Sequence, residues 1–199
     1  GGAYRDPNSP YRSWYDFDPK YKGGYRSWWG FETLPEVNEE TPSYVEFITG
    51  EGGVIDTWLR RGAAGFRLDV ADELPDEFIE KVRTAVKRVG PDKFLLGEVW
   101  EDATTKFGFD KRRTYLLGKG LDSVMNYPFK NAVLGFVCGR DAGQTMTDIL
   151  SICEHYPAPA LDTALNFLST HDTERALTVI ADEPANGRGR AWQSGRCVT

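Results

Sequence analysis

The sequence predicts an α/β fold in which parallel strands alternate with helices. From residue 41 onward, short apolar runs of strand length alternate with longer amphipathic stretches, an order typical of consecutive βα units. No repeat of solenoid period is present. The chain has 199 residues, 40% of them apolar, which is enough for one buried core. We therefore expect the units to form one sheet or barrel after a different N-terminal segment.

That N-terminal segment, residues 1–31, is expected to be a long ordered loop. It holds ten of the 26 aromatic residues, where an even spread would place about four. Prolines and the pair Gly23-Gly24 interrupt it, and neither a helical nor a strand period is sustained. Loops of this length are either functional or disordered, and the aromatic content argues against disorder. The rings could meet sugar faces or pack the loop onto a neighbour, so no ring is assigned a ligand.

The elements that follow are predicted from their start and stop signals. Thr41-Pro42 is typical of a helix start and Gly62 of a stop. Over 76–89 the apolar residues recur at helical spacing, and Gly90-Pro91 ends the pattern. In order, we expect a helix over 41–61 broken at 50–53, a strand over 65–70, a helix over 76–89, strands over 94–100 and 121–126, a helix over 142–155 and a strand over 166–169.

Charge and composition exclude several classes of partner. The formal net charge is −6, which gives no basic field for nucleic acid and no cationic face for an acidic membrane. No apolar stretch approaches the roughly 20 residues of a membrane helix. Cys138, Cys153 and Cys197 are few, odd in number and lack paired spacing, so they predict neither a disulfide framework nor a zinc site.

A charged pair lies at the end of the first predicted strand. Because strand side chains alternate, Arg67 and Asp69 share one face. At the carboxyl end of a barrel strand such a pair points into the mouth where active sites form. Arg67 would keep Asp69 ionised and able to act as a nucleophile. The alternative is a purely structural ion pair.

A second carboxylate, Glu98, ends the next predicted strand. It shares a face with Leu96 and Trp100, and apolar surroundings would favour the protonated carboxyl that a general acid needs. Asp69 and Glu98 are separated by about one βα unit, so we expect them at the ends of adjacent strands.

The third polar cluster, His171-Asp172, follows the last predicted strand. A helix cap or turn is the alternative to a catalytic role. Strict alternation would separate the two side chains, so their convergence requires the chain to leave the sheet there. Two carboxylates in different protonation states, with a third nearby, match the requirement of glycoside hydrolysis.

At these residues the sequence resembles the α-amylase family of glycoside hydrolases, and its neopullulanase and cyclomaltodextrinase branch most. The resemblance rests on GFRLDVADEL around Asp69, LLGEVW around Glu98, FLSTHDT around Asp172, LPEVN at 34–38 and SPYRSWYDF at 9–17. It implies Asp69 as nucleophile with Arg67 as its partner, Glu98 as general acid/base and Asp172 as transition-state stabiliser. His171 would bind sugar.

The resemblance implies an incomplete (β/α)8 TIM barrel. The family's Asp-Asn-His motif at the third strand is absent, and a complete barrel needs about 250 residues. We therefore expect a fragment containing about strands 4 to 7 with their helices, which stops near 193–195. Residues 1–40 would be the loop region after the third strand, and 41–199 the incomplete barrel. No cofactor is required, although the resemblance allows calcium in the full-length protein; the fragment contains no predicted metal site.

The expected activity is retaining hydrolysis of α-1,4 or α-1,6 linkages in α-glucans such as starch, pullulan, cyclodextrin or maltooligosaccharides. The alternatives are a transglycosidase or isomerase using the same intermediate, and a non-catalytic carbohydrate-binding barrel. The isolated fragment is expected to lack part of the active-site mouth. Low cysteine content and the branch resemblance favour a cytoplasmic location, with secretion as the alternative. Oligomeric state is open.

Overall fold

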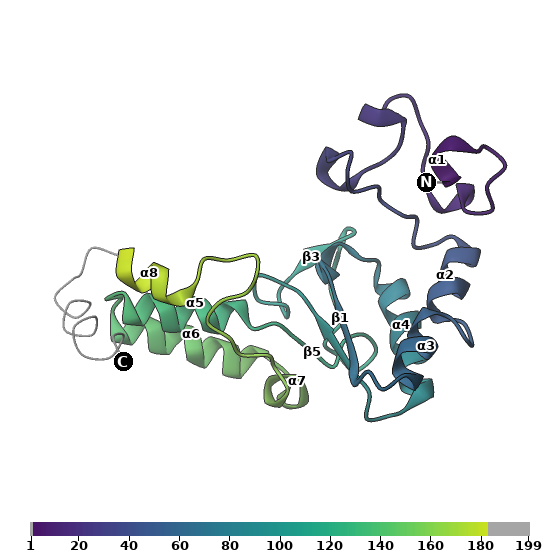
Figure 1. The fold of residues 1–199 in the computed structure, drawn as a ribbon. Coiled ribbons are helices and arrows are strands. Elements are labelled where there is room, and N and C mark those ends of the chain that lie inside the picture. The colour runs from purple at the N-terminus through teal and green to yellow at the C-terminus, as the bar shows by residue number, and fades with distance from the viewer. Residues whose placement is uncertain (1, 183–199) are drawn as a thin grey trace. The chain divides into compact units, whose positions relative to one another are not determined.

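The computed structural model describes residues 2–182 (Figure 1). It divides into two compact units, Gly1–Ala64 with Glu77–Lys93, and Gly65–Asp76 with Phe94–Thr199. Cys197 and the expected end of the fragment at 193–195 lie outside the described residues. Within 2–182, no helix has the length and apolar character needed to cross a membrane.

The N-terminal segment of the first unit is ordered largely by turns, as predicted. It contains α1 (Gly2–Arg5) and three single 3-10 turns, Arg12–Trp14, Lys22–Gly24 and Trp28–Gly30. Two isolated antiparallel bridges, Tyr15 to Val37 and Ser27 to Pro35, close the loop on itself. The placement of a domain boundary at residue 40 stays a prediction.

Three helices complete the first unit: α2 (Pro42–Thr49), α3 (Val54–Arg60) and α4 (Asp76–Val89, from Glu77 on). The break predicted at 50–53 separates α2 from α3. The carboxylate of Asp56 on α3 is buried and accepts a hydrogen bond from Arg88 of α4 at 2.7 Å. On α4 the apolar residues at helical spacing are buried: Phe78, Ile79, Val82, Ala85 and Val86.

A parallel sheet forms the centre of the second unit. Its strands β1 (Gly65–Leu68), β2 (Phe94–Gly97) and β5 (Ser123–Val124) lie in the order β1-β2-β5. Leu68 pairs with Gly97, and Gly97 with Val124. Three of the predicted strands are therefore confirmed as parallel neighbours, each shorter than its apolar run.

The predicted strand over 166–169 is wrong. Among the described residues, backbone pairing of this segment with the sheet is a single parallel bridge between Met125 and Leu165. Beyond that bridge, the Asn126 side chain accepts a hydrogen bond from the Phe129 amide and caps the next helix. The neighbouring chain thus turns into a helix, and residues after Leu165 have no strand there to pair with.

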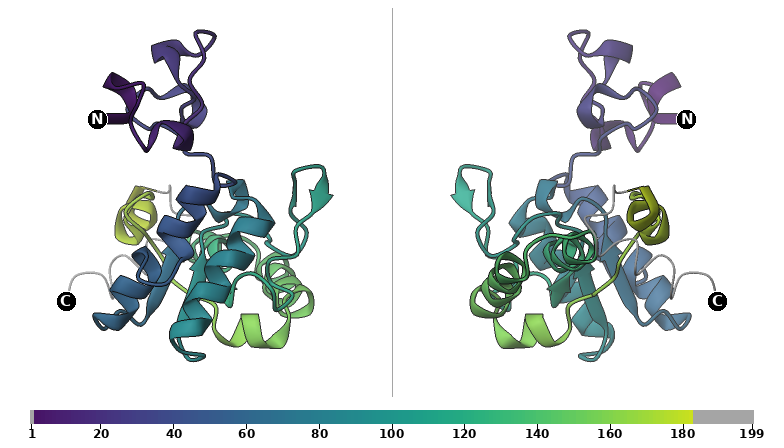
Figure 2. Two further views of the ribbon diagram at one scale, coloured as in Figure 1. Left: turned by 90° about the vertical axis from the view of Figure 1, so that its right-hand side faces the viewer. Right: turned by 90° about the vertical axis from the view of Figure 1, so that its left-hand side faces the viewer.

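A two-residue hairpin, β3 (Phe107–Gly108) with β4 (Lys111–Arg112), was not predicted (Figure 2). Its turn residues Phe109 and Asp110 both have left-handed backbones, with φ of 54° and 58°. Two-residue turns of this kind are usually predicted from Asn-Gly or Asp-Gly, and Phe-Asp is not a typical turn sequence.

Between β5 and residue 182 the chain forms four helices: α5 (Tyr127–Val137), α6 (Ala142–His155), α7 (Ala158–Asp162) and α8 (Ala176–Asp182). Helices α5 and α6 lie side by side (Figure 1). The bounds of α6 are those predicted, because Asp141 accepts a hydrogen bond from the Gln144 amide and caps its start. At the foot of α5, Tyr127 packs with Leu96 and Met125 against Phe94 and Phe167.

Candidate functional site

The site lies where two adjacent parallel strands end. Asp69 is the first residue after β1, and Glu98 the first after β2. Since Leu68 pairs with Gly97, the two carboxylates occupy equivalent positions one step beyond the ladder. The prediction that they follow adjacent strands is confirmed.

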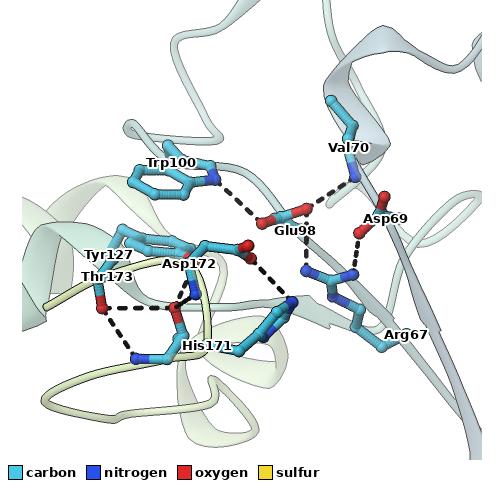
Figure 3. A network of polar contacts seen from close by, with 10 residues as sticks. Arg67, Asp69, Val70, Glu98, Trp100, Tyr127, His171, Asp172 and Thr173 are labelled. Carbon is cyan, nitrogen blue, oxygen red and sulfur yellow. Dashed lines mark hydrogen bonds and ion pairs between the residues drawn. The ribbon is translucent and has the colours of Figure 1, made fainter. Parts of the chain in front are cut away.

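Arg67 lies between the two carboxylates (Figure 3). Its Nη1 contacts Oδ1 of Asp69, and its Nη2 lies 2.9 Å from Oε2 of Glu98. The second contact is an ion pair without hydrogen-bond alignment. Asp69 is otherwise open to solvent, with 75% of its side chain exposed, whereas Glu98 is buried. One guanidinium thus contacts both an exposed and a buried carboxylate.

Glu98 is surrounded by hydrogen-bond donors. Oε2 accepts from the Val70 amide at 2.9 Å, and Oε1 accepts from the Trp100 indole N–H at 3.0 Å. This differs from the apolar surroundings predicted from the sequence. The reason is local: Arg67 lies on the same face, and the turn after β1 aims an amide at the carboxylate.

Two stacked rings connect Glu98 with the third polar cluster. The Trp100 and Tyr127 rings stack with centroids 4.2 Å apart, and Tyr127 Oη lies 3.5 Å from the hydroxyl of Thr170. Burial raises the pKa of Tyr127, the Thr170 hydrogen bond opposes this, and the charges of Glu98 and Asp172 raise it further. The Tyr127 hydroxyl therefore stays protonated and can donate a hydrogen bond at neutral pH.

His171 and Asp172 lie in a turn beyond the sheet. Nε2 of His171 is 3.0 Å from Oδ2 of Asp172; the His171 side chain is largely exposed and that of Asp172 is 44% exposed. The Thr170 amide donates to the Thr173 hydroxyl, which closes the turn. The two side chains converge because the chain has left the sheet, which is the condition set out from the sequence.

Sequence reasoning missed Val70 and Tyr127 and gave Trp100 no role beyond sharing a face with Glu98. The sequence does not indicate the turn at Val70, because a β-branched residue after an apolar run favours continuation of the strand. Tyr127 is at the start of a helix, and its place in the site depends on contacts with Trp100 and Thr170, which are distant in the sequence. Among residues 2–182, no group of three or more His, Cys, Asp or Glu side chains is placed to hold a metal ion, so calcium stays a prediction.

Comparison with known proteins matches most of the chain to one family model. Residues 7–193 match the family model described as Alpha amylase, catalytic domain. The chain is 34% identical over 222 residues to an amylopullulanase of Thermoanaerobacter thermohydrosulfuricus, covering 94% of this chain and 14% of that protein. It is 37% identical over 152 residues to a cyclomaltodextrinase of a Bacillus species, covering 74% and 25% respectively.

Among solved structures, the chain is similar to the cyclic alpha-maltosyl-(1→6)-maltose hydrolase of Arthrobacter globiformis, determined in complex with maltose. The TM-score is 0.78 at 28% identity, over 90% of this chain and 40% of that one. The chain therefore spans less than half the length of each of these proteins.

Proposed function

Because the chain belongs to the α-amylase catalytic-domain family, whose fold is the (β/α)8 barrel, we propose that it supplies the catalytic carboxylates of a retaining α-glucan hydrolase. The observation that carries this proposal is Arg67 bridging Asp69 and Glu98 at the ends of adjacent parallel strands. The names of the relatives, amylopullulanase and cyclomaltodextrinase, support an α-glucan with α-1,4 or α-1,6 linkages as substrate. We assign β1, β2 and β5 to about strands 4 to 6 of the barrel, with the segment after Leu165 at strand 7.

In the first step, Asp69 attacks the anomeric carbon. Oδ1 is held by Arg67, so we assign Oδ2 as the attacking oxygen. The glycosidic bond breaks with its electron pair on the leaving oxygen, which takes a proton from Glu98. Within the described residues Oε2 of Glu98 accepts from Val70 and faces Arg67, while Oε1 accepts from Trp100 alone, so we assign the proton to Oε1.

In the second step, water attacks the anomeric carbon and gives its proton to Glu98, and Asp69 leaves with the bonding electrons. The product keeps the starting α configuration. Asp172 would hydrogen-bond sugar hydroxyls most strongly in the transition state, and His171 would bind the same ring. For retention, the nearest oxygens of Asp69 and Glu98 should come within about 5 to 5.5 Å.

The test uses the protein in its full natural length beside the 199-residue chain. Each is incubated with pullulan, maltotriose and cyclodextrin, and the released anomer is followed by NMR. We expect an α-anomer from the full-length protein, with activity abolished by Asp69→Asn and by Glu98→Gln. Glu101→Gln, which changes an exposed carboxyl three residues away, is the matched control and should retain activity.

A first-formed β-anomer, or substantial activity in Asp69→Asn, would refute the retaining assignment. Products lengthened by an added sugar acceptor would indicate a transglycosidase. Binding without turnover by the full-length protein would favour the non-catalytic alternative.

A further inference from the structure

Val70, directly after Asp69, has a strained backbone. Its φ of 44° and ψ of 49° lie in the left-handed region, which a β-branched residue rarely occupies. Residues held in such conformations persist only when their surroundings enforce them, and they cluster at functional sites.

The strain at Val70 aims two successive amides at one residue. The Val70 amide donates to Oε2 of Glu98 at 2.9 Å, and the Ala71 amide donates to the Glu98 backbone carbonyl at 3.0 Å. In return, the Glu98 amide donates to Leu68. The left-handed residue therefore lets the chain after β1 turn around Glu98 and bind both its side chain and its backbone.

Arg113 forms hydrogen bonds with the segment that follows this turn. Its side chain is completely buried, Nε donates to Asp76 Oδ1 at 2.8 Å, and Nη2 donates to the Leu74 carbonyl at 2.7 Å. Nη1 donates to the Asp72 carbonyl. One planar guanidinium thus binds every second residue from 72 to 76.

Aromatic rings hold the guanidinium in place. Its carbon lies 5.3 Å from the ring centroid of Phe109 and 4.7 Å from that of Tyr115. The left-handed turn of the β3–β4 hairpin contributes Phe109, and β4 leads directly into Arg113. Nothing in this group touches the proposed catalytic carboxylates; its contacts lead toward them through the backbone of 70–76.

We propose that Arg113 is a positioning residue for Glu98. By fixing residues 72–76, it keeps Val70 left-handed and the Val70 amide on Oε2. A lysine could not replace it, because a single ammonium lacks the rigid fork that reaches three acceptors along one segment. This inference rests on the proposed function for its kinetic consequence but not for its structural one.

The kinetic test compares Arg113→Lys with the wild type in the full-length protein, with pullulan as substrate. Displacement of Glu98 should lower kcat about 10- to 100-fold, with KM changed less than about threefold. Combining Val70→Gly with Arg113→Lys should raise kcat at least about threefold above that of Arg113→Lys alone, because glycine occupies the left-handed region without strain. A merely structural role for Arg113 predicts no such rescue. Arg112→Lys, at the exposed neighbour bound to the Thr104 carbonyl, is the control and should change kcat less than about twofold.

A second readout needs no activity. Hydrogen exchange at the Val70 amide should be protected in the wild type and in Arg112→Lys, and about tenfold faster in Arg113→Lys. If the wild type hydrolyses nothing, the proposed function fails while this measurement still decides the positioning role. If Arg113→Lys does not fold, Asp76→Asn replaces it, with an expected exchange increase of about threefold. Unchanged Val70 protection, or a loss of kcat that Val70→Gly does not rescue, would overturn the inference.

Discussion

We expect the coupling free energy between Arg67 and Glu98 to exceed that of an exposed surface ion pair. Its two charged atoms lie 2.9 Å apart, with Glu98 5% and Arg67 28% exposed in their side chains. At an effective dielectric constant of about 20, the gross attraction is about 6 kcal/mol. Desolvation opposes it by several kcal/mol, so the pair itself gives a small net stabilisation.

Removing one partner removes the attraction but leaves the desolvation cost of the other charge. Arg67→Met leaves a buried carboxylate with two neutral donors, and we expect the free energy of unfolding to fall by about 2–3 kcal/mol, below the 3–5 kcal/mol typical of a fully buried pair. Glu98→Gln should cost about 1 kcal/mol, because the amide oxygen can still accept a hydrogen bond. The double variant should be no worse than Arg67→Met alone, a coupling of about 1–2 kcal/mol.

Urea unfolding followed by tryptophan fluorescence measures the four free energies at pH 7. The control cycle is Arg26–Glu36, a pair at 2.8 Å in which the arginine side chain is 56% exposed, where coupling should stay within about 0.2–1 kcal/mol. Additivity of the Arg67 and Glu98 changes to within about 0.5 kcal/mol would refute the reasoning.

Three further changes test other parts of the structure. A hydrogen bond from Arg88 lowers the pKa of Asp56, so this carboxylate stabilises the fold above its unfolded pKa of about 3.9, and that stability is lost as pH falls through the lower folded value. Asp56→Asn should therefore flatten the loss of urea resistance between about pH 5 and pH 2, and an unchanged slope would contradict it. Tyr115→Phe removes a buried hydroxyl with no hydrogen-bond partner in the described chain, and should leave thermal stability unchanged or raise it by up to about 1 kcal/mol. Gly65→Ala would place a Cβ against the Phe94 carbonyl across the β1–β2 pair, and should cost more than about 2 kcal/mol by urea unfolding; a neutral result would show that the strands can separate there.

Local patterns were enough to predict α2, α3, α4 and α6 and the adjacency of β1 and β2. The bounds of α4 and α6 follow from apolar spacing and end signals, which act within a few residues. The adjacency of Asp69 and Glu98 follows from one βα unit between parallel strands. Contact between Arg67 and Asp69 follows from strand alternation.

What the sequence did not reveal depends on residues far apart in the chain. Arg113 ends a run of three basic residues that reads as a solvated surface, yet it is buried because Asp76 and two carbonyls 39 and 41 residues away accept its hydrogen bonds. Likewise, the end of the sheet at Leu165 is set by Asn126, which caps α5 instead of extending β5.

The three proposed catalytic carboxylates are supported very unequally, and this bears on how the site would work. Glu98 is bound through its backbone to both sides of the turn after β1 and through its side chain to Val70, Trp100 and Arg67. Asp69 is largely exposed and Asp172 partly so, and within the described chain their side chains contact Arg67 and His171 respectively. Every reacting group must be held in a productive geometry, and the neighbours that hold Glu98 are more numerous than those that hold Asp69 or Asp172. Substitutions around Glu98 should therefore affect the site through several separate contacts, whereas Asp69 depends mainly on Arg67.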